Sequence, residues 1–485
     1  MNSALNSKLV EGVDRAEDSA TKDDAVFGIR PAVKDYAWGI RGHDSRVGRY
    51  ALACGTITAI DPDAPYAELW IGTHPKGMTY LLSDRGETSL KDAIRTDLPF
   101  LFKILSAGKA LSIQAHPDKS IAEQLNQRDP QNYGDANHKP EMAIALTPFE
   151  AMCGFRRIEE ICLLLKKHTE FANCVSTEAK LAVFVAKDEQ QVKVALRMMM
   201  HSFMNCDERI KSQNLNALLE RLQTEQINIH AHPHDEPPWE RKCSRAVLRL
   251  ASQFPDDAGA MAPFFLNYLL IAPGESFFMA ANEPHAYVAG EIIECMAMSD
   301  NVVRAGLTPK FKDVDTLVNM LTYSQGGPSI DAGYPLESDK RILRYTPPVP
   351  EFEVMILNCE PGDTINLPIA EHAVFIIVEG TGSFRCISDN SNDKNNNKNN
   401  NNNNSGTTTC LPGKCYYHPA GSPPLQFHCP KEKRGPLKVA IAHRNLHLNN
   451  PTTFNKRRGH GSPFVPIAEL RTHIDEVPPT FDYEL

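Results

Sequence analysis

The stretch Phe100-Leu101-Phe102-Lys103-Ile104-Leu105 is a short apolar run that stands between Pro99 and Gly108. An earlier run, Ala67-Glu68-Leu69-Trp70-Ile71-Gly72, has the same character. Short apolar runs bounded by turn residues are typical of β-strands. Because such runs recur from residue 28 to about residue 155, this region is predicted to be a β-sandwich or β-barrel.

The pattern changes between residues 156 and 261, where apolar residues repeat at the i, i+3, i+4, i+7 spacing of a helix. Stripes of this kind run through residues 158–165, 215–222 and 247–254. Their length and spacing predict a set of amphipathic helices that pack together. We therefore expect residues 156–261 to form an inserted helical domain.

A strand-like pattern returns at Phe264 and continues to about Leu448. Within it, residues 391–405 are mostly Asn, and such a tract buries too little apolar area to order itself. The predicted fold class is mainly β with a helical insertion. The predicted domains are a polar tail at 1–26, a β-domain formed by 27–155 and 262–340, the helical domain at 156–261, and a C-terminal β-domain at 341–485 that contains the disordered Asn-rich insertion 391–405.

The composition of the whole chain is that of a soluble globular protein. The 485 residues are 42% hydrophobic and 23% charged, and this length predicts two or three domains. A net charge of −9 argues against general nucleic-acid binding, which needs a surplus of Lys and Arg. None of the 12 cysteines form a Cys-x-x-Cys pair. Without a signal peptide or a membrane-spanning stretch, we expect a cytoplasmic protein, and we further expect a monomer.

Polar residues suited to metal binding or acid–base chemistry gather in two stretches. In Leu111-Ser112-Ile113-Gln114-Ala115-His116-Pro117, an extended backbone places Ser112, Gln114 and His116 on one face. Asn137-His138-Lys139-Pro140-Glu141 holds an imidazole, a cation and a carboxylate, and its proline disfavours a helix. Taken alone, each stretch is explained more simply as a solvent-facing strand or an exposed charged turn.

Two later groups complete the candidates. His285 follows Pro284, whose rigid backbone fixes the approach to the imidazole, and Glu291 and Glu294 flank an Ile-Ile pair. Two histidines, one carboxylate and one amide oxygen would hold zinc and leave a position for water or sugar hydroxyls. From the residues alone, His138 or Glu294 serves as a ligand as well as any other, so the ligand set stays open at this point.

Four motifs together resemble the type I phosphomannose isomerase (mannose-6-phosphate isomerase) family of cupin-fold enzymes. They are Tyr36-Ala37-Trp38-Gly39, residues 67–75, Gln114-Ala115-His116-Pro117 with His138-Lys139-Pro140-Glu141, and residues 291–310, which end in Asp-Asn-Val-Val-Arg-Ala-Gly-Leu-Thr-Pro-Lys. The resemblance covers about residues 28 to 450. It implies two cupin, or jelly-roll, β-domains, of which the first is catalytic. The Asn-rich insertion departs from the family but lies away from these motifs.

The resemblance also implies a site. It places one zinc ion per chain on Gln114, His116, Glu141 and His285. It places the catalytic arginine on Arg304, with Lys139 and Glu294 as further catalytic candidates. The other predicted pocket positions are Lys310, Tyr287, Trp38 and Glu68, to which we add Ser112 and Lys103 as candidate contacts for a phosphate.

Members of this family interconvert mannose 6-phosphate and fructose 6-phosphate, and the predicted residues suit that reaction. Moving a proton between C1 and C2 through an enediol needs a base and positive charge near the developing oxyanion. Zinc acts as a Lewis acid or a template, and Arg304 and Lys139 supply charge. Glu294 is the candidate for proton transfer, in competition with His138 and a zinc-bound water. We expect a role in carbohydrate metabolism that includes GDP-mannose biosynthesis.

Two other functions are compatible with a metal-binding cupin. An oxygenase-type cupin metalloprotein uses two histidines and a carboxylate, but a glutamine ligand and several nearby cations argue against it. A non-enzymatic cupin that binds a sugar-like ligand predicts the loss of metal ligands or of Arg304, and neither is lost.

A short internal repeat bears on the number of metal sites. Residues 273–279 (Pro-Gly-Glu-Ser-Phe-Phe-Met) align with residues 412–418 (Pro-Gly-Lys-Cys-Tyr-Tyr-His), and in this register His285 aligns with Pro424. Two related β-domains and a chance similarity explain the repeat equally well. If the domains are related, the second is expected to carry no metal.

Overall fold

The computed structural model describes residues 26–82, 86–229, 238–367, 369–387 and 407–447. Residues 1–25 of the predicted polar tail and the whole predicted insertion at 391–405 lie outside this part of the chain.

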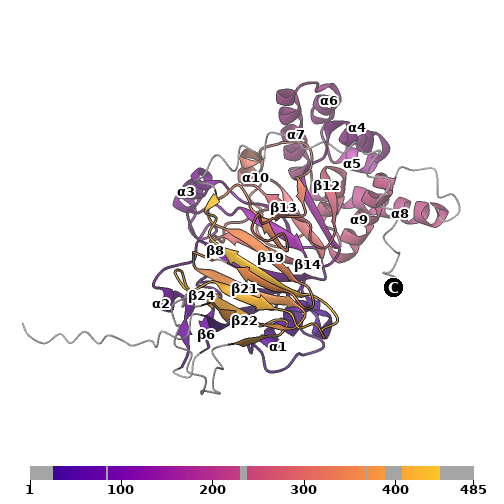
Figure 1. Cartoon of the computed structure of the whole chain (residues 1–485). Coiled ribbons are helices and arrows are strands. Elements are labelled where there is room, and N and C mark those ends of the chain that lie inside the picture. Colours follow the sequence, from indigo (N-terminus) through magenta and orange to yellow (C-terminus); the bar gives the residue numbers. More distant parts are fainter. Residues whose placement is uncertain (1–25, 83–85, 230–237, 368, 388–406, 448–485) are drawn as a thin grey trace, which may run out of the picture.

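The described chain is mainly β with one large group of helices, which confirms the predicted fold class (Figure 1). The helices α4 to α9 gather at one end of the molecule. Their bounds are α4 Ile158–Lys167, α5 Thr169–Asn173, α6 Thr177–Val185, α7 Glu189–Met204, α8 Glu208–Ile229 and α9 Pro238–Gln253, followed by the 3-10 helix η2 Ala258–Phe264. The others are η1 Gly42–Asp44, α1 Arg46–Ala53, α2 Leu90–Ile94, α3 Lys119–Arg128 and α10 Val314–Met320.

The first β-domain is a curled sheet built around one long strand, β14 (His285–Ala297). The C-terminal half of β14 pairs with β10 and β8, and its N-terminal end pairs with β11 and β9. The strand order is β16 Ile330–Asp331, β13 Ser276–Met279, β10 Glu141–Ala145, β14, β8 Phe100–Ala107, β5 Glu68–Ile71 and β2 Ala32–Lys34. Four further strands belong to the same sheet at its curled end: β11 Phe149–Phe155, β12 Leu266–Ile271, β9 Ile113–Ala115 and β15 Val303–Gly306.

The second β-domain is a sandwich of two sheets. Phe375, Phe384, Tyr416 and Phe427 pack between them in the buried core. One sheet has the order β17 Tyr334–Pro335, β18 Ile342–Tyr345, β19 Glu353–Cys359, β26 Leu437–His443, β21 Ala373–Glu379, β24 Cys415–His418, β1 Phe27–Arg30, β6 Tyr80–Leu81 and β7 Thr88–Ser89. The other has the order β20 Thr364–Leu367, β25 Leu425–His428, β22 Gly382–Cys386 and β23 Thr408–Cys410. A small separate sheet pairs β3 Ile40–Arg41 with β4 Pro65–Tyr66.

The two halves of the internal repeat have the same local structure. Gly274 and Gly413 both have positive φ, +87° and +85°, which a residue without a Cβ adopts at no steric cost. Each turn leads into a strand, β13 in the first domain and β24 in the second. The predicted turn and strand are therefore present in both places, and the relatedness of the two domains remains a hypothesis.

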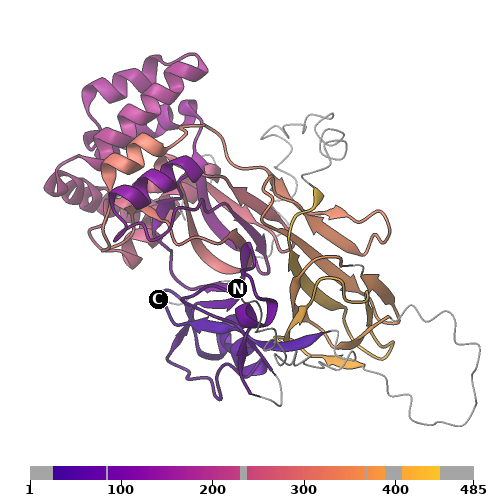
Figure 2. The ribbon, with the colours of Figure 1, turned by 90° about the vertical axis from the view of Figure 1, so that its left-hand side faces the viewer.

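The two β-domains pack sheet against sheet through an apolar layer. Side chains on the outer face of β8, β10 and β14 meet those of β19, β21 and β26, and the layer includes Phe102, Ile144, Ile293, Val374 and Ala440. Figure 2 shows the C-terminal strands, in orange to yellow, on the side of the molecule away from the helices. The inner face of the first sheet is thereby left free to line a site.

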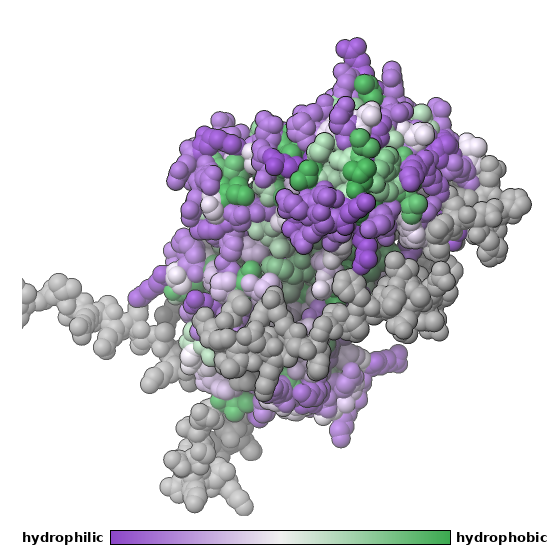
Figure 3. All heavy atoms as spheres, turned by 90° about the horizontal axis from the view of Figure 1, so that it is seen from above, coloured by the Kyte–Doolittle hydropathy of each residue, from purple (hydrophilic) through white to green (hydrophobic). Residues whose placement is uncertain are grey.

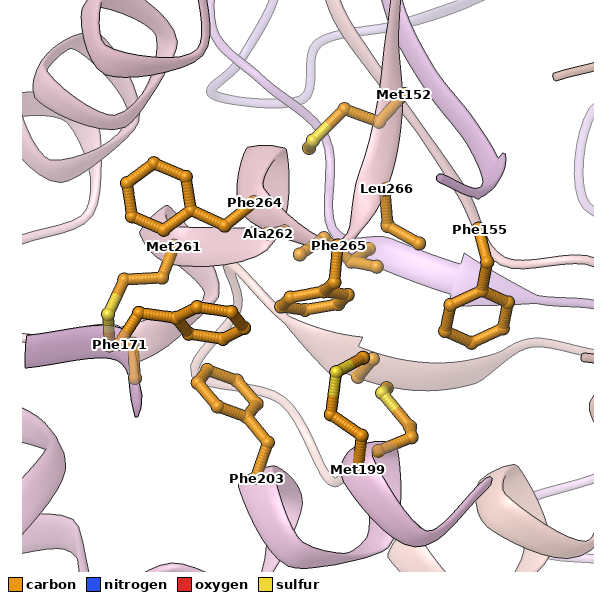
Figure 4. Close-up of a cluster of buried hydrophobic side chains, with 14 of the residues drawn as sticks. Met152, Phe155, Phe171, Met199, Phe203, Met261, Ala262, Phe264, Phe265 and Leu266 are labelled. Atoms are coloured by element: carbon orange, nitrogen blue, oxygen red, sulfur yellow. The ribbon is translucent and has the colours of Figure 1, made fainter. Parts of the chain in front are cut away.

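The helical region joins the first β-domain through a continuous core (Figure 4). Phe171, Phe203, Phe264 and Phe265 pack ring against ring, with centroids 5.3–6.1 Å apart. This cluster extends to β9 and β15, two strands of the first β-domain. The insertion is therefore packed against the strands that carry the candidate site.

The outer surface of the helices is mixed in character. Figure 3 shows this end of the molecule as mostly hydrophilic with several apolar spots. The exposed large apolar side chains of α4, α6 and α7 are Leu163, Leu181, Phe184, Val185, Val194 and Met198. The expected monomeric state stays a prediction. In the described part of the chain, no helix combines the length and the apolar composition that crossing a bilayer requires.

His168 gives the helical region a dependence on pH. It is buried, its ring stacks on Phe264 at 4.3 Å, and Arg221 Nη2 donates to its Nδ1 at 3.0 Å. Burial and, to a smaller extent, the nearby charge of Arg221 together lower the pKa of His168 to about 4. The unfolded chain binds this proton near pH 6.5 and the folded chain near pH 4, so stability falls as the pH falls through that window.

Because of His168, we expect the free energy of unfolding to be about 1–2 kcal/mol lower at pH 5 than at pH 7.5. His168→Phe keeps a flat ring on Phe264 but does not titrate, so it should flatten this part of the pH profile. Urea unfolding of both proteins at the two pH values measures the difference. Equal slopes for the two proteins would contradict the prediction.

Candidate metal centre and active site

Three buried side chains converge at the curled end of the first β-domain. His116 follows β9, Glu141 begins β10 and His285 begins β14. His116 Nε2 lies 3.3 Å from Glu141 Oε1, and His285 Nε2 lies 3.4 Å from Glu141 Oε2. Their candidate ligand atoms all lie within 4.8 Å of one another, and the exposure of each residue is 2% or less. The structure thus brings together three of the four predicted ligands in ligand-like geometry.

The hydrogen bonds of this cluster leave the ligand atoms free. His116 Nδ1 lies 2.7 Å from the carbonyl oxygen of Asn301, and His285 Nδ1 lies 2.9 Å from that of Glu283. A carbonyl only accepts, so each Nδ1 carries the proton and each Nε2 keeps its lone pair. His116 Nε2, His285 Nε2 and Glu141 Oε2 are buried without a hydrogen-bond partner. These three atoms have free lone pairs and face one another, an arrangement that suits a divalent metal ion such as zinc.

The protonation states agree with metal binding. Burial lowers the pKa of His116 to about 4, and Lys139 contributes to this, so the ring is neutral near pH 7. Burial opposes ionisation of Glu141, but Lys139 and His116 hold its pKa well below the usual range. Lys139 Nζ lies 3.2 Å from Glu141 Oε1. The centre therefore offers neutral imidazoles and an ionised carboxylate, which are the forms that bind metal.

A local backbone arrangement holds the two histidines together. Asn282 has φ +64°, a left-handed conformation that asparagine tolerates better than most residues. Its N–H donates to the carbonyl of His116 at 2.7 Å, and its amide group bonds both ways with Asp118 at 2.8 and 3.1 Å. The turn before β14 is thereby tied to the residues after β9.

Gln114 and Arg304 stand in one row with His285. Gln114 pairs with His285 on one side and with Arg304 on the other, across β14, β9 and β15. Directly opposite residues in a sheet project from the same face, so this row borders the metal centre. Arg304 is half-buried, which lowers the pKa of its guanidinium, and it makes no hydrogen bond or ion pair with any described residue. It is a charge held beside the centre without a protein counter-ion.

A second polar cluster lies deeper on the inner face of the same sheet. Lys103 Nζ lies 2.7 Å from Glu294 Oε2 and 3.6 Å from Glu68 Oε2, and Tyr287 donates to Glu294 Oε1 at 2.8 Å. Burial, with help from Glu141 and Glu68, raises the pKa of Glu294 although Lys103 opposes the rise. Burial likewise raises the pKa of Tyr287 well above its usual value.

A strand irregularity explains how Glu294 comes to share a face with Tyr287. Strict alternation along β14 would place residues 287 and 294 on opposite faces. The pairing of β11 with β14 shifts register between Glu150 and Ala151, close to Gly290, whose φ is +108°. A Cβ at residue 290 would lie 2.5 Å from the carbonyl oxygen of Pro148. The shift turns Glu294 inward, while Glu291 faces outward to Arg46 and Ser106.

The remaining predicted residues are spread around these two clusters. Ser112 Oγ lies 3.4 Å from Gln114 Oε1, so these two side chains point the same way, and the role of Ser112 stays a prediction. Trp38 is partly buried, stacks on Tyr36 and packs against the inner core that includes Tyr287. Lys310 is exposed in the segment after β15, and its ammonium forms no hydrogen bond or ion pair with the described residues. Lys103 is engaged by two carboxylates, and its assignment to a phosphate stays a prediction.

Sequence reasoning missed several contacts. Trp70 is buried in a small apolar cluster, but its indole N–H also donates to Glu68, and its ring lies 5.2 Å from Lys103 Nζ. Its position two residues after Glu68 in a strand was the available signal. His138 Nε2 lies 2.5 Å from Glu351 Oε1, a residue that no motif singled out. The carbonyls of Asn301 and Glu283 had no sequence signal, because any residue supplies one.

Comparison with known protein families gives two matches along the chain. Residues 26–158 match the family described as phosphomannose isomerase type I, catalytic domain. Residues 166–266 match phosphomannose isomerase type I, helical insertion domain.

Curated relatives and solved structures point the same way. Mannose-6-phosphate isomerase of Bos taurus is 41% identical over 380 residues, which is 73% of this chain and 88% of the relative. The enzyme of Schizosaccharomyces pombe is 38% identical over 74% of this chain and 89% of its own. A crystal structure of mannose 6-phosphate isomerase bound with zinc and yttrium aligns with a TM-score of 0.68 at 27% identity, covering 87% of this chain and 100% of that chain. A mutant of phosphomannose isomerase from Salmonella typhimurium aligns equally well.

Proposed function

The chain belongs to the type I phosphomannose isomerase family and is an enzyme of the mannose-6-phosphate isomerase class, and we propose that it interconverts mannose 6-phosphate and fructose 6-phosphate at a single zinc centre. We propose His116, Glu141, His285 and Gln114 as the four ligands. The proposal rests on one observation above all, the three buried ligand atoms that face one another without a hydrogen-bond partner. The family matches favour the isomerase over the oxygenase-type and non-enzymatic alternatives, since two histidines and a carboxylate alone would also suit an oxygenase.

The residues around the centre suit the proposed aldose–ketose exchange. When bound, zinc would supply Lewis-acid and templating chemistry to the substrate oxygens. Arg304 and Lys139 would place positive charge where the oxyanion of the enediol develops, and such charge is most effective in a site that excludes water. Glu294, with its raised pKa, is the proposed group for moving the proton between C1 and C2.

The other pocket residues are assigned to binding. We propose that Tyr287 and Lys103 hold the Glu294 carboxylate in place, as their contacts at 2.8 and 2.7 Å suggest. Glu68 and Trp38 would line the sugar pocket. Ser112 and Lys310 would contact the phosphate, with Arg304 within reach of both. The expected cytoplasmic location, monomeric state and role in GDP-mannose supply belong to the same proposal.

Removal of the metal tests the proposal directly. Prolonged dialysis against a strong chelator should abolish most isomerase activity, and one equivalent of zinc per chain should restore it, because the ligand atoms have no other partner. Conversion of mannose 6-phosphate to fructose 6-phosphate and the zinc content should be measured on the same samples. Glu141→Gln should lose both.

Glu291→Gln is the matched control for this experiment. Glu291 is equally buried on the same sheet, but it faces Arg46 and Ser106 on the opposite side from the metal centre. The control should keep its zinc. Full activity after verified removal of zinc would disprove the metal assignment.

A further inference from the structure

The loop that carries Asp135 reaches the metal centre without touching it. Asp135 Oδ1 accepts a hydrogen bond from Ser299 Oγ at 2.8 Å, and its Oδ2 accepts one from the N–H of Asp300 at 2.8 Å. Asn301 Nδ2 donates to the carbonyl of Asp135 at 2.7 Å and lies 3.2 Å from Oδ1. One side chain thereby binds three consecutive residues of the segment that precedes β15.

This segment delivers the carbonyl that orients a metal ligand. Asn301 is fully buried, and its carbonyl oxygen lies 2.7 Å from His116 Nδ1. That contact keeps the proton on Nδ1 and turns Nε2 toward Glu141. If the segment moved by even half an ångström, this hydrogen bond would lengthen and the aim of the ring would no longer be fixed.

The same segment leads directly into the strand of the free arginine. Arg304 lies three residues after Asn301 and pairs with Gln114 across β15 and β9. Fixing residues 299–301 therefore fixes both the orientation of the His116 ring and the start of the strand that carries Arg304.

Asp135 is suited to this holding role because its carboxylate is engaged in hydrogen bonds and not in an ion pair. It forms no ion pair within the described chain and is not among the metal-ligating atoms. Its remaining contact is with the N–H of Asn137, two residues along its own loop, at 2.9 Å. Its carboxylate is therefore free to act as a clamp on main-chain and hydroxyl donors.

We propose that Asp135 is a positioning residue for the metal centre, which fixes the His116 ring through the carbonyl of Asn301. The inference rests on the proposed function, since it requires zinc at His116, Glu141 and His285. It assigns a role to Asp135, a residue that none of the sequence motifs includes.

Asp135→Asn is the test, because it replaces one acceptor oxygen with an NH₂ group that faces donors. We expect its zinc affinity, measured by competition with a chelating dye, to fall about 10- to 100-fold. The absorption bands of the cobalt-substituted enzyme should shift as well, because they report ligand geometry. Asp129→Asn is the matched control: Asp129 is a half-buried aspartate whose carboxylate accepts from the N–H and the side-chain amide of Asn132 at 3.2 and 2.7 Å and contacts none of residues 299–301 by a hydrogen bond. Its zinc affinity should match that of wild type.

A second variant keeps the inference testable if Asp135→Asn does not fold. Ser299→Ala removes the hydroxyl that donates to Asp135 and also contacts the carbonyl of Asn137 and the N–H of Asn301. It should weaken zinc binding several-fold. Wild-type affinity and an unshifted cobalt spectrum in the folded variants would overturn the role of Asp135. Failure of the wild-type enzyme itself to bind zinc would instead overturn the proposed function.

Discussion

Replacing Arg304 with alanine is expected to lower kcat about 100- to 1000-fold, the range found when a preorganised charge that stabilises an oxyanion is lost. Arg304 is the strongest candidate for such a loss because it is half-buried, has no counter-ion among the described residues, and stands beside Gln114 next to the metal centre. Stability should change little, since its guanidinium makes no hydrogen bond with any residue that the structure describes. Steady-state kinetics with mannose 6-phosphate measure the effect.

Two further variants test whether this effect is specific to Arg304. Arg197→Ala removes an exposed arginine that bonds only Asn319, and it should leave kcat unchanged. Arg304→Lys keeps the charge but loses the planar fork of donors, so its kcat should lie between those of wild type and Arg304→Ala. The zinc content should be the same in all four proteins. Turnover of Arg304→Ala near that of wild type would remove the arginine from the proposed chemistry.

Replacing Lys103 with methionine is expected to destabilise the protein by about 3–5 kcal/mol, the usual cost of removing one partner from a buried ion pair. Lys103 is buried between Glu294 and Glu68, so the variant would leave two carboxylates without their cation. Activity should fall as well, because the pKa of Glu294 would rise further without Lys103. Urea unfolding and isomerase assays measure the two effects separately.

The pH dependence identifies the cause of this instability. A buried carboxylate with a raised pKa binds its proton more tightly in the folded state, so the stability lost in Lys103→Met should be partly recovered as the pH falls from 8 toward 5. The double variant Lys103→Met/Glu294→Gln removes the charge of Glu294 at every pH, although Glu68 keeps its own, and it should be more stable than the single variant at pH 8. A loss that is independent of pH and additive in the double variant would show that packing, and not charge, explains it.

Most of the architecture could be predicted because it depends on patterns that are local in the sequence. The apolar runs at 67–72 and 100–105 became β5 and β8, and the helical stripes of residues 158–165 and 247–254 became α4 and α9. Strand alternation placed Ser112 beside Gln114, as found. β1, β6 and β7 come early in the sequence but join a sheet of the second β-domain. This could not be predicted, because no local pattern determines which sheet a strand joins.

The site could be predicted only in part from physical reasoning. Pairing of His116 and His285 with Glu141 required the family resemblance, since His138 and Glu294 have equally suitable chemistry. The structure separates them by distance: His138 is bonded to Glu351, and Glu294 to Lys103 and Tyr287. The inward turn of Glu294 depends on a register shift near Gly290, and such an irregularity cannot be read from strand periodicity.

The pairing of β1 with β24 has a consequence for the order in which the protein is made. Phe27 is paired with Tyr417, so the first described strand leaves the ribosome long before its neighbour is synthesised. At common rates of translation this interval is on the order of tens of seconds. During that time β1 cannot pair with β24, and an unpaired strand edge is prone to aggregation. Folding of the second β-domain is therefore expected to wait until β24 has been synthesised.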